Sequence, residues 1–173
     1  MQVIISYLTN KEIIKYFKSN NFEVIYINKQ DVYDEISSHS DIFVIKVDNN
    51  LVISDNIYSD LSNKIDNKYN LIKVNKIVDK YPNTVKLNVC INNNIAIHNF
   101  KYTDDILNKL LEKYIKINVG QGYTNCNILF FGSSYITSDI GIYNILIKNN
   151  LDVLYIDNSE LDIKLVSNID LNN

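Results

Sequence analysis

The stretch from Gln121 to Ile142 reads QGYTNCNILFFGSSYITSDIGI. It carries two short apolar runs separated by Gly132, and then a Ser-Asp pair that is typical of a helix N-terminus. The expected elements are a strand over 126–131, a turn over 132–134, a returning strand over 135–137, a helix over 140–149 and a strand over 152–156. The stretch therefore predicts a β-β-α-β unit.

Two earlier stretches predict the same order of elements. One has expected strands over 42–47 and 51–53, a helix over 56–65 and a strand over 71–74. The other has strands over 85–91 and 95–97, a helix capped by Thr103 that extends to about Tyr114, and a strand over 116–119. A period of about 40 to 47 residues is typical of a repeat architecture. The chain begins with a β-α-β unit, in which Asn10 caps the helix and Asn20-Asn21 ends it.

Composition bounds the protein class. The 173 residues fit one domain with a sizeable core, and 46% hydrophobic with 21% charged residues is ordinary for a globular protein. All 17 basic residues are Lys, so no bidentate guanidinium clamp is available. The net charge of −3 and the scattered lysines argue against a nucleic-acid surface. No signal peptide or membrane span is expected, and we expect a cytoplasmic protein with free thiols.

The repeated units resemble the pentein, or α/β-propeller, fold of the guanidino-group-modifying enzymes, and more narrowly an uncharacterised clostridial-type family with that fold. The residues that carry the resemblance are His39-Ser40-Asp41, Tyr81-Pro82-Asn83, Asn88, His98-Asn99, Tyr102-Thr103, Gln121-Gly122-Tyr123, Cys126 and Thr137-Ser138-Asp139 with Gly141. The resemblance implies an α/β fold, namely a pentein-like partial propeller in a single domain. Its ββαβ units and its first, shorter unit lie at about 1–30, 39–75, 85–119 and 123–157, followed by a tail over 158–173.

The resemblance also implies a site, because strand ends nearest the propeller axis present polar groups to a central channel. The expected catalytic residues are Cys126, His39 and Asp41, and the expected substrate-binding residues are Asn88, Tyr123, Ser138 and Asp139. The family's own nucleophilic cysteine lies in a last, glycine-rich unit and has no matching position here, and Cys126 lies in a different unit.

A guanidinium group is planar, cationic and rich in hydrogen-bond donors, so Asp41 and Asp139 could accept its N–H groups. A thiolate at Cys126 could attack its central carbon, and His39 could transfer a proton to the leaving amine.

Each candidate also has a purely structural interpretation. Cys126 at the start of an apolar strand could be an inert buried thiol, as Cys90 between Val89 and Ile91 is expected to be. His39 could cap the hairpin, and Asp139 could be only the N-cap of the following helix. His98 is expected to be structural, and Gln121-Gly122-Tyr123 could be no more than a tight turn.

The sequence therefore leaves three function classes open. The protein is a hydrolase or amidinotransferase acting on a guanidino or amidine small molecule, a non-catalytic small-molecule-binding protein, or a scaffold of the same fold. No cofactor is expected, and the His, Asp and Cys spacing is not diagnostic of a metal site. The expected partner is a small guanidino-type ligand. A homodimer is also expected, because a propeller short of units exposes strand edges.

Overall fold

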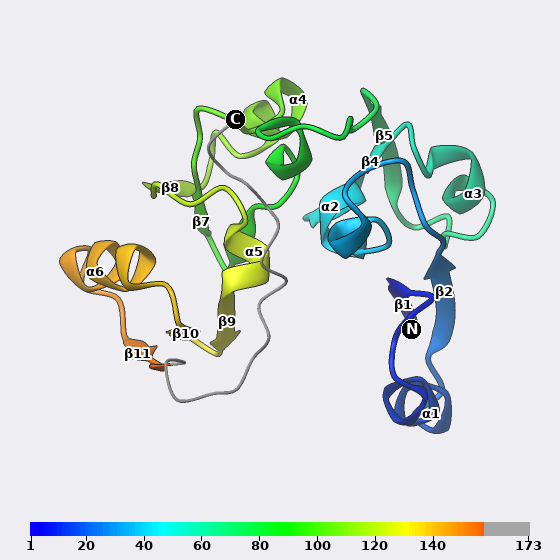
Figure 1. Cartoon of the computed structure of the whole chain (residues 1–173), viewed down its shortest axis with the longest axis horizontal. Helices are drawn as coiled ribbons and strands as arrows, with labels where there is room; N and C mark the ends of the chain where they lie inside the picture. Colours follow the sequence, from blue (N-terminus) through cyan, green and yellow to red (C-terminus); the bar gives the residue numbers. More distant parts are fainter. Residues whose placement is uncertain (158–173) are drawn as a thin grey trace. The chain divides into compact units, whose positions relative to one another are not determined.

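A computed structural model describes residues 1–157 and divides the chain into two compact units, Met1–Leu87 and a second that begins at Asn88. Figure 1 colours the first unit from blue to teal and the second from green to orange. The predicted single domain over residues 1–173 stays a prediction. The predicted tail lies outside the described residues. No helix in residues 1–157 is both long and apolar enough to cross a membrane.

The first unit opens with two parallel strands joined by a helix. Strands β1 (Gln2–Ser6) and β2 (Glu23–Ile27) pair in parallel, and helix α1 (Lys11–Ser19) connects them in the chain. As predicted, Asn10 caps α1 by accepting a hydrogen bond from the backbone N–H of Glu12 at 2.8 Å.

The rest of the first unit contains a mixed sheet of three strands. Its elements are the 3-10 helix η1 (Asp34–Ile36), α2 (Ser40–Phe43), β3 (Val44–Val47), β4 (Asn50–Ser54), α3 (Tyr58–Ser62), β5 (Asn70–Val74) and the 3-10 helix η2 (Asn83–Val85). β3 and β4 are antiparallel, whereas β5 returns parallel to β4 after the α3 crossover.

The second unit contains two further three-stranded sheets. The first sheet consists of β6 (Cys90–Asn92), β7 (Ile95–His98) and β8 (Ile115–Asn118), with α4 (Asp105–Leu110) as its crossover helix. The second consists of β9 (Ile128–Phe131), β10 (Ser134–Thr137) and β11 (Val153–Tyr155), with α6 (Ile140–Lys148) in the crossover and α5 (Thr124–Asn127) before β9. In both, the hairpin is antiparallel and the third strand is parallel to the middle one.

The chain is thus a mixed α/β fold with several small sheets. Within residues 1–157 the strands form one sheet of two strands and three sheets of three strands, and none of these closes on itself. The three larger sheets share the same strand directions, which is the order that the sequence predicts for a ββαβ unit.

The three hairpin turns are closed by residues with a left-handed backbone. Asp48, Asn93 and Gly132 each occupy the first position of a two-residue loop, with φ of 53°, 53° and 60°. Asp, Asn and Gly are the residues that adopt this conformation at little cost, which is why the turns are readable in the sequence.

Asparagine also ends the two nine-residue helices. Asn21 and Asn150 follow α1 and α6 with φ of 60° and 57°. The N–H groups of Phe22 and Leu151 then donate to the carbonyl groups of Phe17 and Leu146, at 3.0 and 3.1 Å. This is the Schellman arrangement, and it explains why the predicted stop at Asn20-Asn21 is correct.

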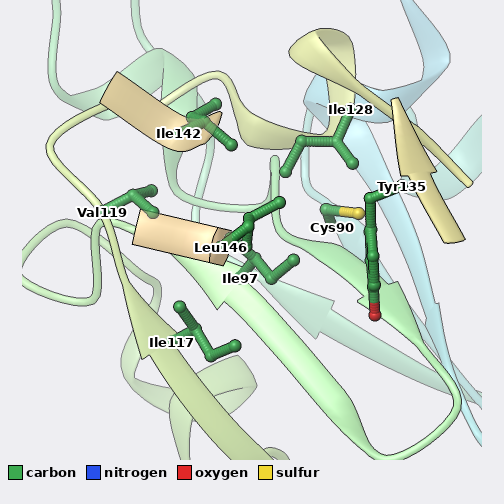
Figure 2. Packing of buried hydrophobic residues seen from close by; sticks show 8 residues of the cluster. All are labelled: Cys90, Ile97, Ile117, Val119, Ile128, Tyr135, Ile142 and Leu146. Carbon is green, nitrogen blue, oxygen red and sulfur yellow. The ribbon is translucent and has the colours of Figure 1, made fainter. Parts of the chain in front are cut away.

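The core of the second unit lies between its two sheets and α6. Figure 2 shows eight buried side chains from both sheets, from the residue after β8 and from the helix, namely Cys90, Ile97, Ile117, Val119, Ile128, Tyr135, Ile142 and Leu146. The Cys90 thiol lies among these apolar side chains, as the sequence predicts.

Three predicted strands begin later than expected. Ser40–Phe43 and Thr124–Asn127 are short helices, so β3 begins at Val44 and β9 at Ile128. β6 begins only at Cys90, although the sequence predicts a strand from Val85. Cys126 and Asn88 therefore precede their strands. For β6 and β9 the physical reason is that Asn88 accepts hydrogen bonds from Thr124 and Asn125 of α5 instead of from a neighbouring strand.

The predicted N-cap of helix α4, Thr103, is wrong by one residue. Asp104 caps α4, because its Oδ1 accepts hydrogen bonds from the N–H groups of Ile106 and Leu107 at 2.9 and 3.4 Å. The Thr103 hydroxyl instead contacts the His98 ring. Helices α3 and α4 are also shorter than the predicted 56–65 and 103–114.

Candidate functional site

Asn88 and Cys126 form the centre of the candidate site. The Asn88 side chain is fully buried, and its Oδ1 accepts hydrogen bonds from the backbone N–H groups of Asn125 and Cys126 at 2.9 and 3.3 Å. These two donors fix the orientation of the amide, because only Oδ1 can accept them. Nδ2 must then be the atom that donates to Cys126 Sγ, at 3.3 Å.

Thr124 connects the start of α5 by hydrogen bonds to the sheet of β6, β7 and β8 and to Asn88 before it. Its Oγ1 lies 2.7 Å from the carbonyl oxygen of Asn88 and 2.8 Å from that of Ile97. The same oxygen accepts a hydrogen bond from the N–H of Cys90 at 3.3 Å. Thr124 is itself fully buried. A four-residue helix with little stability of its own is thus held in place by hydrogen bonds between its Thr124 side chain and backbone groups of Asn88, Cys90 and Ile97.

The two thiols have opposite environments. Cys126 is exposed, so it is not the buried thiol of the structural interpretation. Cys90 is fully buried, and burial raises the pKa of its thiol to about 12 because the thiolate loses its hydration. Cys126 is therefore the thiol that a solute can reach.

The turn that precedes α5 is closed by its own polar groups. Gln121 Oε1 accepts a hydrogen bond from the N–H of Tyr123 at 3.0 Å, and Asn127 Nδ2 donates to the carbonyl of Tyr123 at 2.7 Å. Gln121 Nε2 reaches Asp139 Oδ2 at 3.4 Å. Tyr123 and Asp139 are therefore both connected to the segment that carries Cys126.

Asp139 is the N-cap of α6. Its Oδ1 accepts a hydrogen bond from the N–H of Ile142 at 2.8 Å, and its own N–H donates to Thr137 Oγ1 at 3.1 Å. Thr137 Oγ1 donates in turn to the carbonyl of Asn127 at 2.8 Å. Ser138 lies between Thr137 and Asp139 in the chain and is half-buried. Asp139 thus has the N-capping role that was one of its two interpretations from the sequence.

His39 and Asp41 lie in the first unit. His39 is the exposed N-cap residue of α2, and its carbonyl oxygen accepts from the N–H of Ile42 at 3.2 Å. Asp41 is half-buried in the first turn of the same helix. Cys126 belongs to the second unit, so their assignment to one catalytic group with Cys126 stays a prediction.

The structure adds Thr124 and Asn127, which the sequence did not single out, and it shows the contacts of His98, which the sequence expects to be structural. Thr124 and Asn127 hold α5, although neither has a distinctive sequence context. His98 lies at the end of β7, with its ring bonded to Thr103 and to the carbonyl of Gly122. The contacts of Thr124 could not be predicted from hydrophobic periodicity, because Asn88 and Ile97 are distant from it in the chain.

Comparison with known proteins places the chain in a family. Residues 4–168 match the sequence model described as "Family of unknown function (DUF6873)". The chain belongs to this family. No curated protein matches it.

Among solved structures, the fold is similar to that of the inosamine-phosphate amidinotransferase of Streptomyces griseus. The TM-score is 0.58 at 12% sequence identity, over 86% of this chain and 53% of the amidinotransferase chain. Identity this low concerns the fold alone, which is of the pentein type that the sequence predicts. The chain spans about half the length of that enzyme. The narrower clostridial-type assignment stays a prediction.

Proposed function

We propose that this family member is a pentein-type enzyme that acts on a guanidino or amidine small molecule by hydrolysis or amidino transfer. The hydrogen bond from Asn88 Nδ2 to Sγ of the exposed Cys126 carries the proposal. A buried amide donor directed at a sulfur favours the thiolate over the thiol, and the thiolate is the nucleophile. The fold likeness to an amidinotransferase supports the choice of substrate class.

In the proposed reaction, Cys126 Sγ forms a bond to the central carbon of the substrate. A carbon–nitrogen bond then breaks, and the leaving amine takes a proton from His39. Water or an acceptor amine displaces the sulfur from the resulting amidino thioether and returns a proton to His39. Asp41 and Asp139 are proposed to accept the N–H groups of the cationic substrate, as the sequence suggests.

The roles proposed for the binding residues follow from the contacts. The sequence assigns Asn88 to substrate binding, but three of its side-chain hydrogen bonds go to Asn125 and Cys126. We therefore propose that Asn88 holds and activates Cys126 instead. Tyr123, Ser138 and Asp139 stay as proposed substrate-binding residues. The propeller arrangement of the units and the cytoplasmic location also stay predictions of the sequence.

A second candidate function is non-catalytic binding of the same class of ligand, or a scaffold role. Asp139 favours it, because this carboxylate caps α6 through Oδ1 and receives Gln121 through Oδ2. A carboxylate engaged in this way holds the fold together and is less available to a substrate. The same experiment separates the two functions.

The test is the alkylation rate of Cys126 as a function of pH, with Cys90 as the internal control. Mass spectrometry distinguishes the two peptides. Rapid labelling of Cys126 well below the ordinary thiol pKa of about 8.5 supports an activated nucleophile. A panel of guanidino and amidine compounds is then tested for slower labelling and for release of an amine. The Cys126→Ser variant must release none.

Labelling of Cys126 that rises only above about pH 8.5 contradicts the enzyme proposal. If a guanidino compound still protects such an ordinary thiol, the binding function holds. If none of the compounds binds, the scaffold role is left.

A further inference from the structure

Both ring nitrogens of His98 form hydrogen bonds within the second unit. Nδ1 lies 2.7 Å from Thr103 Oγ1, and Nε2 lies 2.8 Å from the carbonyl oxygen of Gly122. The side chain is fully buried at the end of β7. The imidazole therefore connects the end of β7 and the nearby Thr103 to the turn at Gly122, which lies 24 residues further along the chain.

These contacts select one tautomer of the neutral ring. A carbonyl oxygen can only accept, so Nε2 must carry the hydrogen that it donates to Gly122. Nδ1 then has a free electron pair, and the Thr103 hydroxyl donates to it. The ring is thus an Nε2–H imidazole whose donor is directed at the backbone of the turn before α5.

Gly122 is the point at which the chain enters the segment that carries Cys126. Beyond it, Thr124 and Cys126 are held by Asn88 and by the sheet. The incoming end of the same segment is held by His98 through the Gly122 carbonyl. The chain just before α5 is therefore held by the His98 side chain, and α5 itself is held by the Asn88 side chain and by the bonds of Thr124 to the sheet backbone.

We propose that His98 is a positioning residue for Cys126, which holds the Gly122 carbonyl and so sets the placement of the thiol against Asn88. It acts through the backbone and does not touch the reacting atoms. The inference rests on the proposed function in so far as it assigns a purpose to that placement. A weak hydrogen bond to sulfur depends on geometry, so a small displacement of α5 would separate Cys126 Sγ from Asn88 Nδ2.

The test uses two pairs of matched variants. His98→Gln keeps an amide donor near the position of Nε2, whereas His98→Asn is too short to reach Gly122. Thr103→Ser keeps the hydroxyl that bonds to Nδ1, and Thr103→Val removes it at nearly constant volume. We expect the alkylation rate of Cys126 at neutral pH to fall about tenfold in His98→Asn and to stay within about threefold of the wild type in His98→Gln.

The Thr103 pair is the milder arm, in case His98→Asn does not fold. The Val variant is expected to slow the alkylation of Cys126 and the Ser variant to leave it unchanged. A folded His98→Asn or Thr103→Val protein whose Cys126 labels at the wild-type rate would overturn the proposal. Equal slowing in both members of a pair would also overturn it, because the change would then be a general loss of structure.

Two readouts separate this inference from the proposed function. Long-range proton–nitrogen NMR of the imidazoles must show the Nε2–H pattern for His98, and the chain has one other histidine to assign. Amide exchange at Asn125 and Cys126 must become faster in His98→Asn and not in His98→Gln. If Cys126 is unactivated in the wild type, the proposed function fails, yet these readouts still support or overturn the positioning role.

Discussion

Asn88 and Cys126 are 38 residues apart in the chain, and two hydrogen bonds join them. The Asn88 amide donates to Cys126 Sγ at 3.3 Å and accepts from the Cys126 N–H at 3.3 Å. The two bonds define both the backbone and the thiol of the same residue. Different substitutions at Asn88 should therefore separate the effect on thiol chemistry from the effect on local structure.

Asn88→Asp tests the donor role of this amide. The carboxylate keeps two oxygen acceptors for Asn125 and Cys126, but it has no donor for Sγ and places a negative charge beside the thiol. Both changes disfavour the thiolate, so the alkylation rate of Cys126 at neutral pH should fall by about tenfold or more. Asn88→Leu removes the three side-chain hydrogen bonds and should cost about 1–3 kcal/mol for each N–H that is left without a partner. Equal alkylation rates in wild type and Asn88→Asp would contradict the donor role.

The buried Cys90 thiol should make stability fall at high pH. Its pKa is raised from 9.0 to about 12 in the folded protein, so between these values the unfolded chain has lost the proton and the folded protein has kept it. The stabilising contribution is fully present below pH 9.0 and declines toward about pH 12. The free energy of unfolding should fall by up to about 1.4 kcal/mol per pH unit.

Denaturant unfolding at a series of alkaline pH values measures this slope. Tyr and Lys residues titrate in the same range, so the difference between the wild type and Cys90→Ala isolates the thiol. The variant should have the shallower slope, and identical slopes would show that Cys90 ionises freely in the folded state.

The β9–β10 turn offers a matched pair at Gly132. Its φ of 60° is the conformation that Asp48 and Asn93 adopt in the two equivalent turns. Gly132→Ala should cost about 1 kcal/mol of stability, because an L-residue with a Cβ is strained there. Gly132→Asn should cost much less, since asparagine adopts the same φ in β6–β7. Thermal unfolding checks the order, which would be reversed if helix or strand propensity dominated.

The predicted homodimer can be tested on the last sheet. Leu129, Ile136 and Leu154 form a cross-strand row, in which Leu129 is 71% and Leu154 58% exposed. The row Cys90, Ile97 and Ile117 of the preceding sheet is instead buried in the core. We expect a second copy of the chain to cover the exposed row, because each buried Leu would contribute about 2 kcal/mol.

Leu129→Lys should then shift the chain from dimer to monomer in light scattering at micromolar concentration. Leu8→Lys is the matched control, since Leu8 is 68% exposed in the first unit and should not change the oligomeric state. A monomeric wild type would count against the dimer.

Local sequence determined the turns, the caps and the order of elements. Asp48, Asn93 and Gly132 close the hairpins, Asn21 and Asn150 end the long helices, and Asp139 caps α6. Each of these preferences depends on φ or on a hydrogen bond within a few residues, so it is visible in a short window. The β-β-α-β order could be predicted from apolar runs for the same reason.

Tertiary structure alone decided which residues Cys126 contacts. The sequence favoured a strand over 126–131, and nothing near Asn88 indicates that it would bond to Asn125 and Cys126. The same holds for His98, whose ring joins Thr103 to Gly122. A buried polar side chain must find a partner, but the partner's identity depends on which segments pack together, and that is a property of the folded chain.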